Sequence, residues 1–432
     1  MTTHDPNTVL LTGATGFLGK VVLEELLRKG QMLSVASIVL VVRGRQGLNG
    51  RERFVKHTAT SKCFSLLPYH WQKSIKIFDG DLGLPLCGLS KEDYNWVTGN
   101  ITHIIHVAGY VKFDGETSEA VNSNIMSALN ILNLAKACRR LQRLVTTSTA
   151  YSMPPSTAPI FENLPILPVP ASQLYHDLVE GKLDKEEAIK LTGHPNIYSL
   201  SKCLAEHLLV EQQGSVPLTI VRPSIICASW KYPMPGWIDS RAAFGGFTAG
   251  FAAGILCVVN GQRDAKLDLV PVDEVALCLI VQALRVKDSP LVVLQTPRIV
   301  FCVSTTSNSF TLEEACHMLT IFFKHRRQGI RQPAFRYIGP RNILFHASEM
   351  IYHRIPLHIM AATLRLSGRD KKAAAVRKAY RATVAMNDVF APYSNQTYDF
   401  KPADYAILHF DKQKYMEQIC EGVVEHLMQP RL

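Results

Sequence analysis

The sequence lacks long charge-free apolar runs, low-complexity segments and paired cysteines. A membrane-spanning helix needs about 20 consecutive apolar residues, whereas the apolar run at 244–259 has sixteen residues, four of them glycine. With 47% apolar residues, the chain is expected to bury a core and not to stay disordered. Its 432 residues can form two or three domains.

The ten cysteines are scattered without a C-x-x-C pair or zinc-finger spacing, which argues against a disulfide framework and a structural zinc site. His103 and His106 are three positions apart in a predicted strand, so they face opposite sides. The first residues, MTTHDPN, lack the basic and apolar regions of a secretory signal. We therefore expect an intracellular protein with reduced, buried thiols and no bound metal.

The net charge of +11 comes from one part of the chain. Between Lys324 and Arg381 there are fourteen Lys or Arg residues and only two acids. Such a segment favours a phosphate-rich ligand or an anionic membrane surface, although it can also be a solvated basic face. Nucleic acid is not expected as a partner because no recognition motif accompanies the charge.

An amphipathic stretch, Arg354–Leu366, lies inside this basic segment and ends before Gly368. We expect it to be a helix that lays Leu357, Met360 and Leu364 into a membrane interface. The alternative is that this face packs on the rest of the protein.

Short apolar strands alternate with amphipathic helices over the first half of the chain. This alternation predicts an α/β fold with a Rossmann-type, doubly wound parallel sheet covered by helices on both faces. Helices are expected at about 117–138 and 198–213, and strands at 9–11, 37–42, 75–78, 103–107, 144–147 and 218–221.

The regular alternation stops near residue 230. A loop rich in Pro, Gly and Trp is expected at 230–240, followed by the run at 244–259. Glycines weaken a helical interpretation of that run, so we expect a substrate-lining part at about 230–262, with a re-entrant membrane element as the alternative. Residues 1–330 are predicted to form the cofactor-binding domain, and residues 331–432 a helical basic domain.

Three glycines follow the first strand at Gly13, Gly16 and Gly19. A strand, a glycine-rich turn and a helix start together predict a dinucleotide site, because the free N–H groups of a helix N-terminus bind a diphosphate. Thr15, Phe17 and Leu18 belong to the same turn. The second strand is followed by Arg43 and Arg45 where NAD enzymes usually have an acid, so NADPH is predicted over NADH.

Tyr198 and Lys202 are at positions i and i+4 of a predicted helix, on one face. A neighbouring ammonium is expected to lower the pKa of the phenol toward neutrality, which would make Tyr198 an acid–base catalyst, and Lys202 can also hold the nicotinamide ribose. Ser148 and Thr149 end the fifth strand, and either can supply the hydroxyl that polarises a carbonyl. Asn124 can anchor a water relay or make an ordinary helix-start hydrogen bond.

These motifs together resemble the extended short-chain dehydrogenase/reductases and, more closely, the fatty acyl-CoA reductases. The resemblance extends almost from end to end, and its most specific elements are the PMPGWIDS and LSGRDKKAAAVRKAY segments. The matching segments are TGATGFLG at 12–19, GDLGLPLCGLS at 80–90, HIIHVAGYVKFD at 103–114, STAYS at 148–152, YSLSKCLAE at 198–206, VRPSII at 221–226, PMPGWIDS at 233–240, DLVPVDEVA at 268–276 and LSGRDKKAAAVRKAY at 366–380.

The resemblance implies that two NADPH molecules reduce a long-chain acyl-CoA, in the C14–C18 range, to a primary alcohol through an aldehyde, supplying ether lipid or wax synthesis. It also implies cofactor contacts by Asp81, Leu82, Ala108, Pro223 and Ser224. The alternative activity is an extended dehydrogenase acting on a sterol, sugar or aldehyde.

Two departures from the family pattern limit what can be transferred. The segment 247–254 differs from the family's glycine-rich segment, so the acyl length preference is not carried over. Thr146 and Thr147 replace the usual residues before STAYS, which leaves the choice between Ser148 and Thr149 open.

The sequence ends with Pro430-Arg431-Leu432. A small, a basic and a leucine residue resemble the S-K-L peroxisomal signal. We therefore expect a peroxisome or a related organelle such as the glycosome, and otherwise a cytoplasmic or membrane-peripheral protein.

Overall fold

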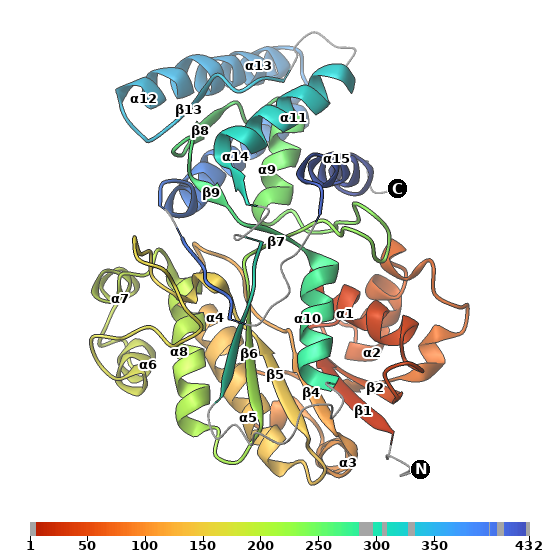
Figure 1. Cartoon of the computed structure of the whole chain (residues 1–432). Coiled ribbons are helices and arrows are strands. Elements are labelled where there is room, and N and C mark those ends of the chain that lie inside the picture. Colours follow the sequence, from red (N-terminus) through yellow and green to blue (C-terminus); the bar gives the residue numbers. More distant parts are fainter. Residues whose placement is uncertain are drawn as a thin grey trace.

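The computed structural model describes residues 6–284, 297–304, 309–326, 333–396, 398–403 and 410–428. The tripeptide Pro430-Arg431-Leu432 lies outside these residues. Figure 1 shows a sheet with its helices in the lower part of the view and a mostly helical part above it.

The centre of the lower part is a seven-stranded parallel sheet in the order β11-β6-β5-β4-β1-β2-β3. The reversal of strand order next to β1 is typical of dinucleotide-binding sheets. This arrangement confirms the predicted Rossmann-type fold. The strands are β1 (Asn7–Thr12), β2 (Val35–Val42), β3 (Ile75–Asp79), β4 (His103–His106), β5 (Arg143–Thr147), β6 (Leu218–Pro223) and β11 (Arg298–Cys302).

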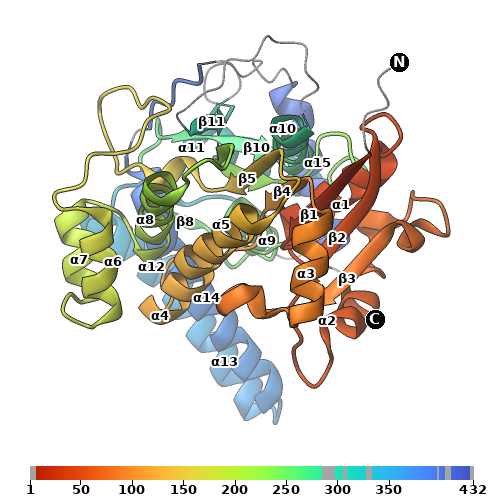
Figure 2. The ribbon, with the colours of Figure 1, turned by 90° about the horizontal axis from the view of Figure 1, so that it is seen from below.

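Both faces of this sheet are buried, because successive strand residues point to opposite sides. Val9 and Leu11 of β1 belong to one hydrophobic cluster and Leu10 to the other. The first face is covered by α1 (Phe17–Arg28) and α10 (Val272–Leu284), and the second by α3 (Lys91–Asn100), α5 (Ser127–Ala137) and α8 (Ile197–Gln212), as Figure 2 shows.

Smaller elements surround this sheet. The predicted helix at 117–138 is divided by a π-helical segment, η5, between α4 and α5. The bounds are α2 (Gly50–Arg53), α4 (Thr117–Ala120), η5 (Val121–Met126), α6 (Ala171–Val179) and α7 (Lys185–Thr192).

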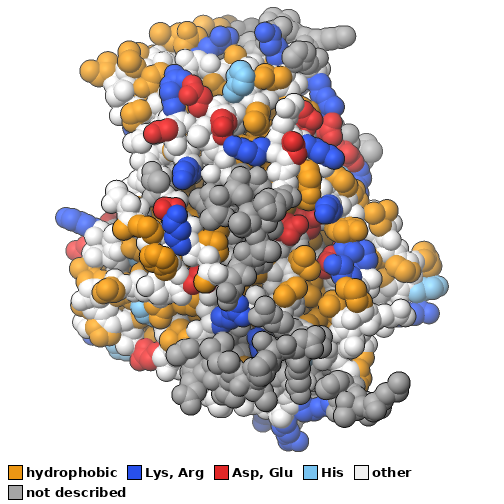
Figure 3. All heavy atoms as spheres, viewed as in Figure 1, with side chains coloured by type: hydrophobic (Ala, Val, Ile, Leu, Met, Phe, Trp, Pro, Cys, Tyr) orange, Lys and Arg blue, Asp and Glu red, His pale blue; other side chains and the backbone are white. Residues whose placement is uncertain are grey.

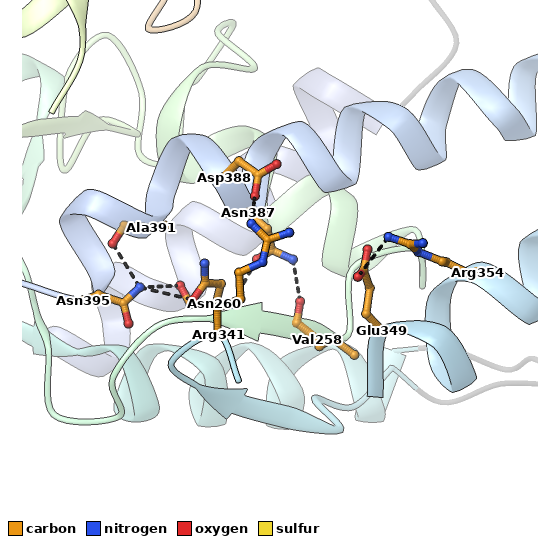
Figure 4. A network of polar contacts seen from close by, with 9 residues as sticks. All are labelled: Val258, Asn260, Arg341, Glu349, Arg354, Asn387, Asp388, Ala391 and Asn395. Carbon is orange, nitrogen blue, oxygen red and sulfur yellow. Dashed lines mark hydrogen bonds and ion pairs between the residues drawn. The ribbon is translucent and has the colours of Figure 1, made fainter. Parts of the chain in front are cut away.

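The upper part joins residues from the middle and the end of the chain. Strand β13 (Tyr337–Gly339) pairs with β8 (Val258–Asn260), and Asn387 of α14 donates to the backbone oxygen of Val258 (Figure 4). Its helices are α9 (Ala243–Ala252), α11 (Leu312–Arg326), α12 (Ile343–Glu349), η7 (Met350–Arg354), α13 (Ile355–Leu366), α14 (Asp370–Ser394) and α15 (Lys412–Gly422), and its other short strands are β7 (Ile225–Cys227), β9 (Lys266–Leu267), β10 (Leu269–Pro271) and β12 (Phe310–Thr311).

The first part of the glycine-studded run, 244–252, lies in helix α9, so the expectation that glycines weaken a helix is wrong there, whereas the rest of the run forms a turn and the start of β8. The glycines permit close packing: a Cβ on Gly246 would lie 2.2 Å from the backbone oxygen of Arg241. Phe247 and Phe251 of α9 are buried and both stack on Phe335. Most of the run is therefore core.

No helix in the described residues is long and apolar enough to cross a membrane. All ten cysteines are buried free thiols, in agreement with the sequence. Among the described residues, no three His, Cys, Asp or Glu side chains group as ligands for a metal ion.

Candidate active site

A cavity of about 480 Å³ lies at the carboxyl ends of the sheet strands. Ligands of open α/β sheets bind at this edge, where the strand order reverses. The cavity wall contains nearly all the predicted site residues. Its members include Gly13, Thr15, Gly16, Phe17, Leu18, Gly19, Arg43, Asp81, Leu82, Ala108, Ser148, Thr149, Tyr198, Lys202, Pro223 and Ser224.

The glycine-rich turn connects β1 to α1 and forms one end of the cavity. Gly13 has φ +75°, and a Cβ there would lie 2.6 Å from the backbone nitrogen of Ala108. A Cβ on Gly19 would lie 2.0 Å from the oxygen of Gly13. Only glycine therefore fits at these two positions, and the N-terminus of α1 faces the cavity with its unpaired N–H groups.

Thr12 fixes the neighbouring strand end. Its hydroxyl accepts hydrogen bonds from the backbone nitrogens of Val107 (3.2 Å) and Ala108 (3.3 Å) and pairs with His106 at 2.8 Å. Burial lowers the pKa of His106 to about 3. His106 is therefore a neutral partner that orients β4, and it carries no charge near the site.

Two arginines border the cavity beyond the glycine turn. Arg43 follows β2, lies at the surface and pairs with Asp81 at 3.4 Å. Arg53 in α2 donates to the backbone oxygen of Arg43 at 2.8 Å and approaches the hydroxyl of Thr15 at 3.5 Å. Arg45 is absent from the cavity wall and its backbone pairs with Leu48 in the loop instead.

Arg53 was missed by the sequence reasoning. It is ten residues beyond β2 in sequence, and only the turn at 45–48 and the short helix α2 bring it back to the strand end. Burial and the charges of Arg45 and Arg43 lower its pKa. Cations gathered in this way favour an anionic group between them.

Tyr198 and Thr149 bring two hydroxyl groups together in the cavity. Tyr198 begins the first turn of α8, and Thr149 follows β5, where its hydroxyl accepts from the backbone nitrogen of Tyr151 at 3.2 Å. The hydroxyl of Thr149 lies beside the phenol of Tyr198 in the cavity wall. Burial raises the pKa of Tyr198, and the neighbouring hydroxyl of Thr149 offsets only part of the rise.

Lys202 lies one turn after Tyr198, but its ammonium is directed elsewhere. Its Nζ donates to the backbone oxygen of Thr147 at 3.0 Å. Burial lowers the pKa of Lys202 to about 8, against the opposing charge of Glu206. The expectation that Lys202 lowers the pKa of Tyr198 is therefore wrong for this structure, because burial dominates both groups.

Asn124 is absent from the cavity wall; it is buried in η5, behind the wall and next to α8. Its side chain accepts from the backbone nitrogen of Tyr110 (2.8 Å) and donates to the oxygen of Tyr110 (3.0 Å) and to Ser201 (2.9 Å). The side chain thus joins separate elements by structural hydrogen bonds and does not cap its own helix, while its part in a water relay stays a prediction. These bonds fix the loop after β4 against the helix that carries Tyr198.

Ser148 differs from Thr149. Its Oγ is buried in the cavity wall and has no hydrogen-bond partner among the described residues, and the same holds for Oγ1 of Thr147. Two buried hydroxyls without partners are costly unless a bound molecule satisfies them. They mark this wall as a polar contact surface for a ligand.

Aromatic residues from the C-terminal part close the cavity above Tyr198. Tyr393 of α14 accepts from Asn196 at 2.8 Å, and Phe113 packs edge-on against Tyr198 at 5.4 Å between ring centroids. Val389 and Phe390 of α14 also line the cavity. No sequence pattern predicted that these distant residues would lie beside the tyrosine.

The loop at 233–240 packs directly on the glycine-rich turn. The ring of Trp237 is buried against Phe17 at 5.3 Å, and Asp239 forms an ion pair with Lys20 of α1. The carboxylate of Asp273 accepts from the backbone nitrogens of residues 230–232. Of the predicted substrate-lining part, Ser240, Ala242 and Ala243 reach the cavity wall.

The cavity fits a nicotinamide dinucleotide in the donor groups that it offers. Gly13 and Gly16 have no side chains that would keep a diphosphate away from the backbone of the turn. The hydroxyls of Thr147 and Ser148 lie in the wall near Lys202. Tyr198 and Thr149 supply the paired hydroxyls of a carbonyl site.

Comparisons with known proteins agree with this geometry. The protein family described as "Male sterility protein" matches residues 11–279. Fatty acyl-CoA reductase 1 of Rattus norvegicus is 32% identical over 378 residues, covering 85% of this chain and 71% of the relative. The Homo sapiens protein of that name is 31% identical, with 85% and 72% covered, and the Xenopus laevis protein is 29% identical, with 98% and 85% covered.

Solved structures support the fold. The terminal R domain of the myxalamid biosynthetic pathway aligns with a TM-score of 0.66 at 21% identity, covering 99% of this chain and 93% of that one. The UDP-glucuronic acid 4-epimerase of Bacillus cereus, solved in complex with NAD, aligns with a TM-score of 0.51 at 15% identity, covering 77% and 87%.

Proposed function

Because the chain belongs to the fatty acyl-CoA reductase family, we propose that it reduces a long-chain acyl-CoA with NADPH to a primary alcohol through a bound aldehyde. The chain is an oxidoreductase of the short-chain reductase type. One observation carries the proposal: the neighbouring hydroxyls of Tyr198 and Thr149 share a cavity with the glycine-rich turn.

The reduced nicotinamide, when bound, supplies a hydride to a carbonyl carbon. Tyr198 and Thr149 hold the carbonyl oxygen of the thioester by donating hydrogen bonds to it. These bonds strengthen as negative charge develops on the oxygen, which is the condition for catalysis by an oxyanion hole. The carbon–sulfur bond then breaks, and coenzyme A leaves as a thiol after gaining a proton while the aldehyde stays in the cavity.

The same two hydroxyls hold the aldehyde oxygen for a second reduction. Here Tyr198 transfers its proton to the oxygen as the alcohol forms. The raised pKa of Tyr198 keeps the phenol protonated at neutral pH, as a proton donor requires. In total two NADPH and two protons are consumed, and one thiol and one alcohol are released.

Lys202 has a positioning role in this proposal. Its ammonium is fixed by the oxygen of Thr147 at the end of β5, next to the hydroxyls of Thr147 and Ser148. From there it is placed to bind the ribose next to the nicotinamide.

The preference for NADPH rests on Arg43 and Arg53. Both line the same end of the cavity, and Arg53 donates to the backbone of Arg43. A planar guanidinium binds a phosphate group with two parallel hydrogen bonds. We place the 2′-phosphate between them, with Asp81 holding Arg43 in place.

The acyl chain is placed along the apolar wall of the cavity. Val111, Phe113, Val389 and Phe390 lie there, beside Tyr198. These residues come from the loop after β4 and from α14, so the substrate would lie between the lower and upper parts of Figure 1.

The decisive experiment incubates the purified full chain with NADPH or NADH and a panel of acyl-CoAs, aldehydes, sterols and sugar nucleotides. Mass spectrometry identifies the products. Alcohol formed from C14–C18 acyl-CoA with NADPH supports the proposal. Turnover of a sterol or sugar without any acyl-CoA product would replace it with the dehydrogenase alternative.

Use of the alcohol in ether lipid or wax synthesis is a proposal that follows from the product class. The peroxisomal location predicted from Pro430-Arg431-Leu432 also stays a prediction. Fluorescence microscopy of the chain fused behind a fluorescent protein tests it, with Leu432 deleted as the control.

A further inference from the structure

The outer surface of α12, η7 and α13 has a high density of exposed apolar side chains. Among the described residues, nine of the 24 exposed large hydrophobic residues lie within 343–366. Ile343 and Leu366 at the two ends are 86% and 91% exposed. Large apolar patches of this kind on a folded protein mark an interaction site. The cap surface is defined here by Ile343, Leu344, Ile351, Ile355, Ile359 and Leu366.

The three helical segments follow one another from Ile343 to Leu366. Ile355, Ile359 and Leu366 are at positions i, i+4 and i+11 of α13, which places them in one stripe along the helix. Leu357 and Leu364 are half-buried on the other side of the helix. Leu357 lines a separate cavity of about 240 Å³ together with Met360, which is 44% exposed. Of the face predicted to enter a membrane interface, only Met360 is therefore exposed.

Polar contacts hold this helical run to the molecule from its inner side. The ring of His353 in η7 is buried and accepts from the backbone nitrogens of Cys257 (2.9 Å) and Val258 (3.2 Å). Arg341, just before α12, pairs with Asp388 of α14 at 3.3 Å (Figure 4). The cap surface is thus presented by an anchored helix.

Positive charge surrounds the end of the run. Arg365 and Arg369 flank Leu366 at the turn into α14, and this hairpin extends away from the rest of the molecule in Figure 2. Between residues 350 and 387 the sequence has one acid, Asp370. The basic residues of this stretch are Arg354, Arg365, Arg369, Lys371, Lys372, Arg377, Lys378 and Arg381.

We propose that the cap surface docks on an anionic lipid bilayer. The apolar stripe would enter the boundary between headgroups and acyl chains, and the basic residues at the hairpin would contact the phosphates and other anionic headgroups. A helix with a large apolar face, a cationic border and few acids binds membrane interfaces in this way. Figure 3 shows hydrophobic and basic side chains gathered along the edge formed by α12 and α13.

Charge decides between a lipid surface and a second copy of the chain. Packing two cap surfaces together would bring like charges around Arg365 and Arg369 toward each other, with Asp370 as the single acid of this stretch to offset them. An anionic bilayer supplies the opposite charge and also accepts apolar side chains. Docking would place the helical part against the membrane. This membrane binding does not depend on the reduction reaction proposed above.

The test is sedimentation of the purified full chain with phosphatidylcholine vesicles, with and without phosphatidylserine, at low and high salt. Binding is expected only to the anionic vesicles and should weaken as salt increases. Because each basic residue near the surface contributes roughly fivefold, changing Arg365, Arg369, Lys371 and Lys372 to Gln together should weaken binding at least tenfold. Changing Ile355, Ile359 and Leu366 to Ser should do the same.

Two matched variants serve as controls. One changes exposed apolar residues elsewhere, Leu66, Tyr69 and Ile166, to Ser, and the other changes Lys56, Lys73, Lys91 and Lys136 to Gln. Both should bind vesicles like the unchanged chain, and NADPH binding by fluorescence verifies that every variant is folded. Equal binding to neutral vesicles, equal losses in the controls, or self-association through the cap surface without vesicle binding would overturn the proposal.

Discussion

The active-site cavity and the cap surface differ in which side chains they bury: polar groups are buried around the cavity, whereas apolar groups are exposed on the cap surface. Around the cavity, Thr149 and Asn124 are buried and hydrogen-bonded to neighbours, and Tyr198 is half-buried in the wall. On the cap surface, Ile359 and Leu366 are exposed, and Arg365 precedes Leu366 in the sequence. Burial shifts the pKa values of Tyr198 and Lys202 at the cavity. The cap surface, in contrast, consists of exposed apolar side chains.

The difference shows that two kinds of function can be told apart by burial. A site that performs chemistry needs groups whose orientation and protonation are set in advance. A surface that meets a large fluid partner needs only exposed area and charge of the right sign. Substitutions should therefore act steeply and individually in the cavity, and weakly and additively on the cap surface.

The largest effect is expected from Tyr198→Phe. Removing the proton donor should lower kcat by about 10²–10⁴-fold while NADPH still binds, because general acid catalysis contributes that much. Steady-state kinetics and NADPH fluorescence measure the two quantities. Tyr175→Phe removes a phenol near Met126, away from the cavity, and should leave kcat unchanged. Similar kcat values for both variants would remove Tyr198 from the mechanism.

Substitutions on the inner and outer sides of the upper part should differ in their effect on the free energy of unfolding. Phe251 is fully buried against Phe335, so Phe251→Ala should lower the free energy of unfolding by about 3–5 kcal/mol. Ile359→Ala on the cap surface should change it by less than about 0.5 kcal/mol. Denaturant titration compares the two. A comparable loss from Ile359→Ala would mean that the cap surface is part of the core.

The pH dependence of kcat/KM should reflect Lys202, whose pKa is lowered to about 8 by burial. The ammonium is present below this pH and is lost above it. If the charge is needed, kcat/KM should be constant below pH 8 and fall about tenfold per unit above it, since kcat/KM reports groups of the free enzyme. Lys202→Arg keeps the charge at all these pH values and should abolish the basic limb. A flat profile to pH 9.5 in the unchanged chain would contradict this role.

Cofactor preference should respond more mildly. Arg53→Gln removes one charged donor, so the Kd for NADPH should rise about tenfold and that for NADH should stay the same. Arg43→Asp should shift the preference further toward NADH, because the new carboxylate can accept from a 2′-hydroxyl. Arg51→Gln, in the same helix but exposed, is the control. An equal change in the Kd values for NADPH and NADH would mean that these arginines do not bind the 2′-phosphate.

Much of the fold was predictable because each strand of the sheet is short, apolar and next to a clear turn. The glycines at 13, 16 and 19 and the pair Tyr198–Lys202 mark the site for the same reason: their spacing is local. Arg53 and Tyr393 were not predictable, since tertiary packing alone brings α2 and α14 to the cavity. The most exposed stripe of α13 differs from the predicted face, because both sides of the helix are apolar and packing against α14 selects one.

The central claim is that one cavity performs both reductions through Tyr198 and Thr149. The most direct test is mass spectrometry of the product formed from an unlabelled acyl-CoA with NADPH deuterated at its transferable position. The account predicts a primary alcohol with two deuterium atoms on C1, together with loss of this product in Tyr198→Phe. A product with one deuterium atom, or doubly labelled alcohol formed undiminished by Tyr198→Phe, would contradict it.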